Sequence, residues 1–100
     1  MYGLLHRLTS TGKPSAIFVA NESLGLEAAY ILQHVLKVRV PQDISLLGME
    51  STQVSQFISP PMTTIAQPLT ELAEKSLEVV LGQLADGGEP RRVVLENRLM

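Results

Sequence analysis

The sequence predicts an α/β protein with a parallel sheet and flanking helices. Two short apolar runs, residues 16–20 and 44–49, each stop abruptly at polar residues. Continuous apolar runs of this length are typical of strands buried on both faces. A helical pattern separates the two runs, so we expect a right-handed crossover that makes the strands parallel.

Composition limits what this segment does. With 45% apolar and 18% charged residues, the 100-residue chain is globular and amounts to one small domain at most. A net charge of −2 gives no indication of a nucleic-acid-binding surface. The absence of cysteine excludes disulfides and thiolate metal sites, which fits a cytoplasmic location. No apolar run approaches the roughly 18 residues of a membrane span, so no membrane partner is expected.

The start of the chain predicts a helix over residues 2–11, which Gly12 and Pro14 would end. Its first residues have neither the basic leader nor the long apolar segment of a signal peptide. They resemble a helix already under way, which suggests a piece of something longer.

The helix predicted over residues 22–36 is apolar on more than one side. Leu26, Ala29 and Tyr30 extend its apolar face beyond what a single sheet contact needs. Either another part of the protein covers this surface or it forms a subunit interface.

Asn21 and Glu50 are the first candidates for a functional site, because each follows one of the two predicted strands. Ligands of parallel sheets bind beyond the carboxyl ends of the strands. Asn21 has two compatible interpretations, a helix N-cap and a ligand contact, and position alone weights them about equally. Glu50 could also be simply an exposed carboxylate at a strand end.

The second half of the chain begins with an irregular loop over residues 51–61 that has room for one helical turn. Phe57 and Ile58 in this loop either tuck beneath it or add to the surface at Leu26. The Pro60-Pro61 pair could hold a cis peptide bond, although trans is the expectation. A short extended segment (63–67), an amphipathic helix (68–86) and a last strand (92–96) are predicted to follow.

No catalytic constellation emerges from the sequence. It contains no Gly-rich phosphate loop, no nucleophile elbow and no His pair at metal-ligand spacing, so no cofactor or metal is predicted. Glu22 and Glu50 could pair as acid and base, but nothing in the sequence sets their pKa values apart. We therefore expect a protein that is not an enzyme.

Three motifs in order carry a family resemblance: residues 14–22 (PSAIFVANE), 40–50 (VPQDISLLGME) and 59–68 (SPPMTTIAQP). In sequence and spacing they closely resemble the C-terminal part of the effector-binding domain of lactose-repressor-family regulators. The similarity covers about residues 12–99.

The resemblance implies a periplasmic-binding-protein-like (type I) domain of two lobes, with a small molecule between them. It implies ligand contacts at Asn21 and Glu50, with Glu22 and Ser51 on the rim. Family dimerisation surfaces match Leu26, Tyr30, Phe57 and Ile58. Glu50 is longer than the aspartate usual in the family and Met49 replaces an aromatic residue, so a typical hexose pose does not follow.

The resemblance also implies that the chain is a fragment. Residues 1–66 would belong to the C-terminal lobe and 67–96 to the N-terminal lobe, with 97–100 returning toward the first. The DNA-binding domain and most of the N-terminal lobe would be absent.

The leading hypothesis is therefore an effector-sensing and dimerising segment of a cytoplasmic bacterial transcription regulator. Its partners would be a second copy of the chain, a sugar-like effector and, only through the absent domain, operator DNA. The alternative is a fragment of an exported sugar-binding transport protein of the same fold. An enzyme ranks third.

Overall fold

The computed structural model describes residues 1–50 and 53–100. The chain divides into two compact units, here called unit 1 (residues 1–66 with 99–100) and unit 2 (residues 67–98).

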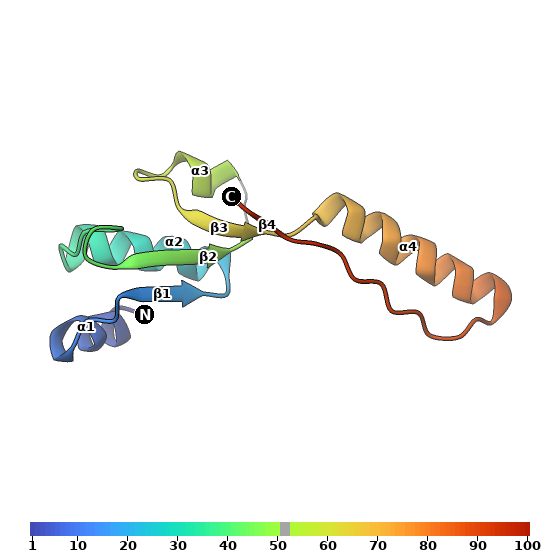
Figure 1. Ribbon diagram of the computed structural model, residues 1–100, viewed down its shortest axis with the longest axis horizontal. Coiled ribbons are helices and arrows are strands. Elements are labelled where there is room, and N and C mark those ends of the chain that lie inside the picture. The colour runs from blue at the N-terminus through green and yellow to red at the C-terminus, as the bar shows by residue number, and fades with distance from the viewer. Residues whose placement is uncertain (51–52) are drawn as a thin grey trace. The chain divides into compact units, whose positions relative to one another are not determined.

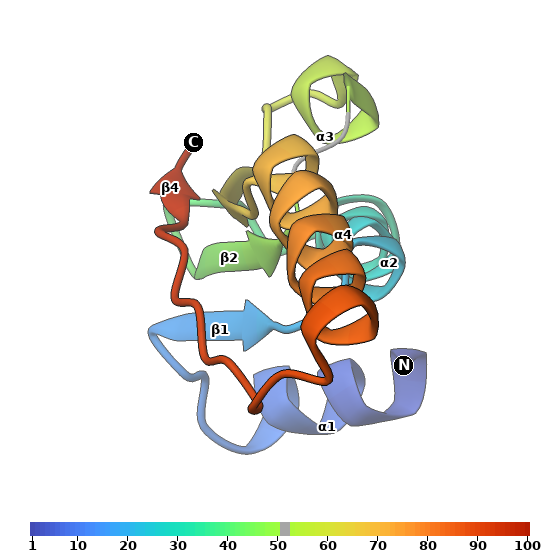
Figure 2. The ribbon, with the colours of Figure 1, turned by 90° about the vertical axis from the view of Figure 1, so that its right-hand side faces the viewer.

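Unit 1 is built on a sheet whose strand order is β1-β2-β3-β4 (Figure 1). The strands are β1 (Ala16–Val19), β2 (Ser45–Met49), β3 (Thr63–Ala66) and β4 (Arg98–Leu99). β1 pairs with β2 in parallel, and so does β2 with β3, which confirms the predicted parallel sheet. The arrows of β1 and β2 point the same way in Figure 2. Next to β4, Thr64 and Met100 exchange both backbone hydrogen bonds, at 3.2 and 2.8 Å.

The helices of unit 1 are α1 (Tyr2–Thr11), α2 (Glu22–Tyr30), the π-helical turn η1 (Ile31–Val35) and α3 (Gln53–Phe57). The helix predicted over 22–36 is therefore present, but its last turn is wider than an α-helical one. In that turn Leu36 N–H donates to the carbonyl of Ile31, five residues back, at 2.8 Å. A π turn thus continues the chain from α2 toward β2.

The hydrophobic core of unit 1 lies on one face of the sheet. Ile17 and Val19 of β1 pack against it, so the alternation of a strand directs Phe18 to the opposite face. Phe18 is 54% exposed there. Buried side chains from α1, α2, η1 and the strands form one cluster: Leu5, Ala28, Ala29, Ile31, Leu32, Val38, Ile44, Leu46 and Met62.

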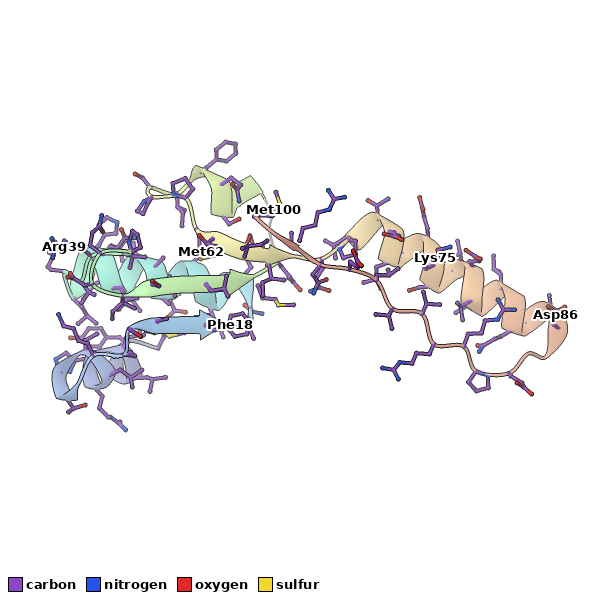
Figure 3. The ribbon with its side chains drawn as sticks, in the orientation of Figure 1. Phe18, Arg39, Met62, Lys75, Asp86 and Met100 are labelled. Atoms are coloured by element: carbon purple, nitrogen blue, oxygen red, sulfur yellow. The ribbon has the colours of Figure 1, made fainter. Side chains whose placement is uncertain are left out.

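Two glycines let α2 approach β2 closely beneath the Met62 side chain. A Cβ added to Gly48 would lie 2.8 Å from Met62 Cε, and one added to Gly25 would lie 3.3 Å from the same atom. Met62 is 5% exposed and precedes β3 (Figure 3). Its thioether therefore fills a space that side chains at positions 25 and 48 would otherwise take.

An ion pair closes the turn that leads into β2. Arg39 Nη2 lies 2.9 Å from Asp43 Oδ1, while Arg39 Nε and its backbone N–H both donate to Oδ2 at 3.0 and 2.9 Å. These hydrogen bonds from Arg39 lower the pKa of Asp43 to about 2. The Val40–Pro41 bond inside this turn is cis, and so is Ser59–Pro60, where trans was expected.

Unit 2 consists of α4 (Leu69–Asp86) and an extended segment that runs back along it (Figure 1). The predicted amphipathic helix is confirmed, and it ends at Gly87 in the left-handed conformation with φ 61°. None of its residues is buried, and Leu84 is 77% exposed. The strand predicted over 92–96 is wrong: the segment forms no ladder, since no described strand pairs with it.

We predict that Gly48→Ala destabilises unit 1 by about 1 kcal/mol, because the new methyl group overpacks the space that Met62 occupies. Met62→Ala should cost about 2–4 kcal/mol, and the double variant should cost less than the sum of the two. Chemical denaturation measures each value. Gly3→Ala is the matched control: its Cβ meets nothing within 4 Å. Equal tolerance of the two glycine substitutions would contradict this packing.

We predict that the stabilisation of the fold by the Arg39–Asp43 pair is lost as the pH falls below 3.8. The folded pKa of Asp43 is about 2, below its ordinary value of 3.8. Its contribution is therefore complete above pH 3.8 and is lost as the pH falls toward 2. Asp43→Asn should remove this part of the dependence in denaturation series, whereas Asp86→Asn at the end of α4 should not. An Asp43 carboxyl that titrates near pH 4 by NMR would refute the assignment.

Candidate functional site

The polar residues that follow β1 and β2 emerge at one edge of the sheet. Val19 of β1 pairs with Gly48 of β2, so the two parallel strands end side by side. Asn21 lies two residues beyond Val19, and Glu50 directly follows the end of β2. We call these two residues, with Glu22, the carboxyl-edge rim. The topology thus brings to one edge the residues that the sequence singled out.

Asn21 caps α2. Its Oδ1 accepts a hydrogen bond from Leu24 N–H at 3.1 Å, and its backbone is extended, with φ −145° and ψ 134°. This is the geometry that N-cap residues adopt. The capping interpretation is therefore confirmed. Asn21 is also exposed, and its contact with a ligand stays a prediction.

Glu50 has a left-handed backbone conformation, with φ 65°. This conformation costs a residue with a Cβ roughly 1 kcal/mol. Glu50 N–H donates to the carbonyl of Ile65 in β3 at 2.8 Å, which continues the ladder past the end of β2. The hydrogen bond to β3 therefore fixes the direction in which the chain leaves the sheet. Glu50 is exposed at that point.

Glu22 and Ser51 are the other two residues that the sequence placed on the rim. Glu22 is half-buried at the first position of α2, where a carboxylate is favoured by the helix dipole. Ser51, which the sequence placed on the rim, lies outside the described residues.

A second candidate surface is apolar and lies on α2 and the loop after α3. Leu26, Tyr30 and Ile58 line a shared hollow of about 320 Å³, and Tyr30 is 62% exposed. The Tyr30 and His34 rings lie 5.0 Å apart along one side of it. Phe57 is 82% exposed, so it does not tuck beneath its loop. The structure brings Leu26, Tyr30 and Ile58 together around this hollow, and their role in a subunit interface stays a prediction.

The described part of the chain offers no group of three His, Asp or Glu side chains arranged to hold a metal ion. Among residues 1–50 and 53–100, no helix combines the length and apolar character that a bilayer crossing requires. The two candidate sites formed by the predicted residues are the carboxyl-edge rim and the apolar surface of α2.

Comparison with known proteins identifies the family. The periplasmic binding protein-like domain model matches residues 2–100, and the chain belongs to this family. The ribose operon repressor of Haemophilus influenzae is 32% identical over 95 residues, which are 94% of this chain and 28% of the repressor. The transcriptional repressor PurR of Aliivibrio salmonicida is 36% identical over 81% of this chain and 24% of its own length. The chain thus spans about a quarter of the length of the curated relatives it matches.

Solved structures agree with this assignment. The regulator CelR in complex with cellobiose matches 99% of this chain and 31% of its own, with 28% identity and a TM-score of 0.86. The Lac repressor bound to ONPG matches 99% of this chain and 30% of its own, with 30% identity and a TM-score of 0.82. The resemblance to lactose-repressor-family regulators and the expected α/β fold are confirmed.

We predict that Asn21→Ala lowers the stability of unit 1 by about 1 kcal/mol, because Leu24 N–H loses its acceptor. Asn21→Ser should retain most of that stability, since a serine hydroxyl also caps helices. Thermal unfolding followed by circular dichroism measures both. An Asn21→Ala protein as stable as Asn21→Ser would show that the 3.1 Å hydrogen bond does not contribute.

Proposed function

We propose that this chain is the effector-sensing and dimerising segment of a bacterial transcription regulator. The observation that carries the proposal is the carboxyl-edge rim: Asn21 and Glu50 leave two neighbouring parallel strands at one edge. Ligands of open α/β sheets bind at this edge. The repressors that match nearly the whole chain support a regulatory role.

The effector would be a sugar or a sugar-like molecule. A carboxylate accepts hydrogen bonds from hydroxyl groups, and the asparagine side chain also provides amide donors. The matched CelR structure holds cellobiose, which supports this ligand class. Glu50 is one methylene longer than aspartate, so its carboxylate reaches further from its fixed backbone. Effector binding would change the arrangement of the lobes, a population shift between two states.

The chain would supply one side of the binding cleft. Residues 1–66 would form the C-terminal lobe, 67–96 would belong to the facing lobe and 97–100 would return to the first. Division of the chain into units 1 and 2 supports this assignment. The matched repressors are about four times as long as the aligned region, which leaves room for the facing lobe and an operator-binding domain.

The apolar surface at Leu26, Tyr30, Phe57 and Ile58 would pair with a second copy of the chain. An aromatic side chain as exposed as Phe57 is unfavourable in water, and Tyr and Phe are enriched in interfaces. A monomeric exported carrier has no need of such a surface. This favours a cytoplasmic regulator over the transport alternative.

An enzymatic function is the third hypothesis. The matched relatives are repressors, and we propose no catalytic role for Glu22 or Glu50. Turnover that disappears on changing either glutamate would overturn that view.

We predict that the isolated chain binds sugars only in the millimolar range, because one rim supplies few of the contacts that a closed cleft provides. Cellobiose and ribose, titrated into ¹⁵N-labelled protein, should shift the amide signals of Asn21, Glu22 and Glu50. Glu50→Gln should reduce these shifts, and Glu27→Gln on the exposed side of α2 should not. Micromolar binding by calorimetry would refute the proposal that the chain supplies only one side of the binding cleft.

We predict that Leu26→Asp combined with Ile58→Asp abolishes self-association, because two charges would be buried in the proposed interface. Sedimentation equilibrium measures the effect. Leu4→Asp, at an exposed position of α1, is the control for adding a charge outside that surface. Unchanged self-association of the double variant would show that the interface lies elsewhere.

A further inference from the structure

A cavity of about 400 Å³ lies at the edge of the sheet opposite the carboxyl-edge rim. Its lining includes the first residue of each parallel strand: Ala16 of β1, Ser45 of β2 and Thr63 of β3. A strand of four or five residues spans about 15 Å, so this cavity and the rim are separate places. Most of its lining residues belong to the three sequence motifs, but those motifs give no indication that these residues meet around one cavity.

One wall of this amino-edge cavity is apolar and built from core residues, while Ala16, Ser45 and Thr63 at the strand starts are exposed. Ala29, Leu46 and Met62 line it, and all three are buried members of the core cluster. A wall made of core residues is present before a ligand arrives. The volume lies within the range of about 300–1,000 Å³ that small-molecule pockets occupy.

The mouth of the cavity is polar and carries positive charge. A second, open hollow of about 640 Å³ shares Gln33, Val40, Pro41 and Pro60 with the cavity and adds Lys37 and Arg39. Arg39 is neutralised by Asp43 at 2.9 Å. Within the described residues Lys37 has no ion pair, so it supplies the net charge of the mouth. Arg39 marks this end of unit 1 in Figure 3.

Gln33 lines both the cavity and the open hollow at its mouth. It belongs to the π turn η1, and turns of this kind occur frequently at functional sites. Its Nε2 lies 3.4 Å from the carbonyl of Ala29, which is a long hydrogen bond. The carboxamide therefore has donor capacity for an anionic group held beside Lys37.

We propose that the amino-edge cavity is a second small-molecule site, and that its ligand is a free amphipathic monocarboxylate. The apolar body of the ligand fills the chamber between Ala29, Leu46 and Met62. Its carboxylate stays at the mouth, where Lys37 supplies the positive charge and Gln33 a hydrogen-bond donor. A sugar does not suit this chamber, because its hydroxyl groups would lose their hydrogen bonds to water against apolar walls.

The test uses the full 100-residue chain, with octanoate as the probe. Octan-1-ol has the same apolar body without the charge, and octylammonium reverses the charge. Octanoate and octylammonium are titrated to about 20 mM, and octan-1-ol up to its aqueous solubility, into ¹⁵N-labelled protein; ligands that bind should shift amide signals at Gln33, Lys37, Ser45 and Met62. Octanoate should bind at least about fivefold more tightly than octanol, and octylammonium more weakly than either.

Variants separate the chamber from its mouth. Lys37→Met should weaken octanoate about fivefold and leave octanol within about twofold, whereas Lys75→Met on α4 should change neither. Val40→Trp should fill the cavity and abolish binding of both, because Val40 lines the cavity and packs against the core. Ala29→Leu, on the wall formed by α2, serves the same purpose if the first variant does not fold, as judged by circular dichroism.

Three results would overturn the proposal: no shifts with octanoate, shifts confined to other residues, or octanol binding as tightly as octanoate. Asn21→Ala and Glu50→Gln should leave octanoate binding unchanged. The outcome is thus independent of whether the carboxyl-edge rim binds a sugar.

Discussion

The handedness of the strand crossovers is the constraint on which unit 1 depends. The strand order β1-β2-β3 advances by one position at each crossover, and both pairings are parallel. Right-handed crossovers that advance in one direction place their helices on the same face. The buried core accordingly lies on the side of Ile17 and Leu46, while Phe18 on the other face is half exposed. Because parallel sheets are normally covered on both faces, this open face is where a larger domain would add its next layer.

The same constraint separates the two candidate sites. All three parallel strands begin at one edge, at the amino-edge cavity, and end at the other, at Asn21 and Glu50. One helical element reaches from edge to edge, since Asn21 caps α2 and Gln33 lies in the π turn that prolongs it. The apolar surface at Tyr30 lies on this same element. Ligand sites and dimer surface would therefore be connected through one continuous helical segment rather than through the loops.

Local signals explain what the sequence predicts well. The apolar runs at β1 and β2, the period of α4, the asparagine cap and the glycine after α4 each act within a few residues of chain. Features that depend on distant partners were missed. The extended segment 92–96 has strand-like composition, but a strand forms only beside another strand. The left-handed Glu50 is tied to Ile65 in β3, and glutamate itself carries no signal for that conformation.

The packing of Met62 over two glycines could not be predicted either, because Gly25 lies in α2, Gly48 in β2 and Met62 just before β3. Their spacing along the chain follows no period that a pattern could reveal. The rim was predictable for the opposite reason. Parallel strands bring their carboxyl ends to one edge whatever the details of packing, so finding the strands was enough to find Asn21 and Glu50.

The π turn at Ile31–Val35 also bears on how this fold tolerates changes of length. Hydrogen bonding across five residues instead of four places one more residue in a turn than an α-helix does. An additional residue can thus be absorbed inside the element without moving Asn21 at its start or Ile44 in the core beyond its end. Chains that differ by one residue here could keep both strands in register, so that insertion and deletion reshape the surroundings of Gln33 while the sheet stays the same.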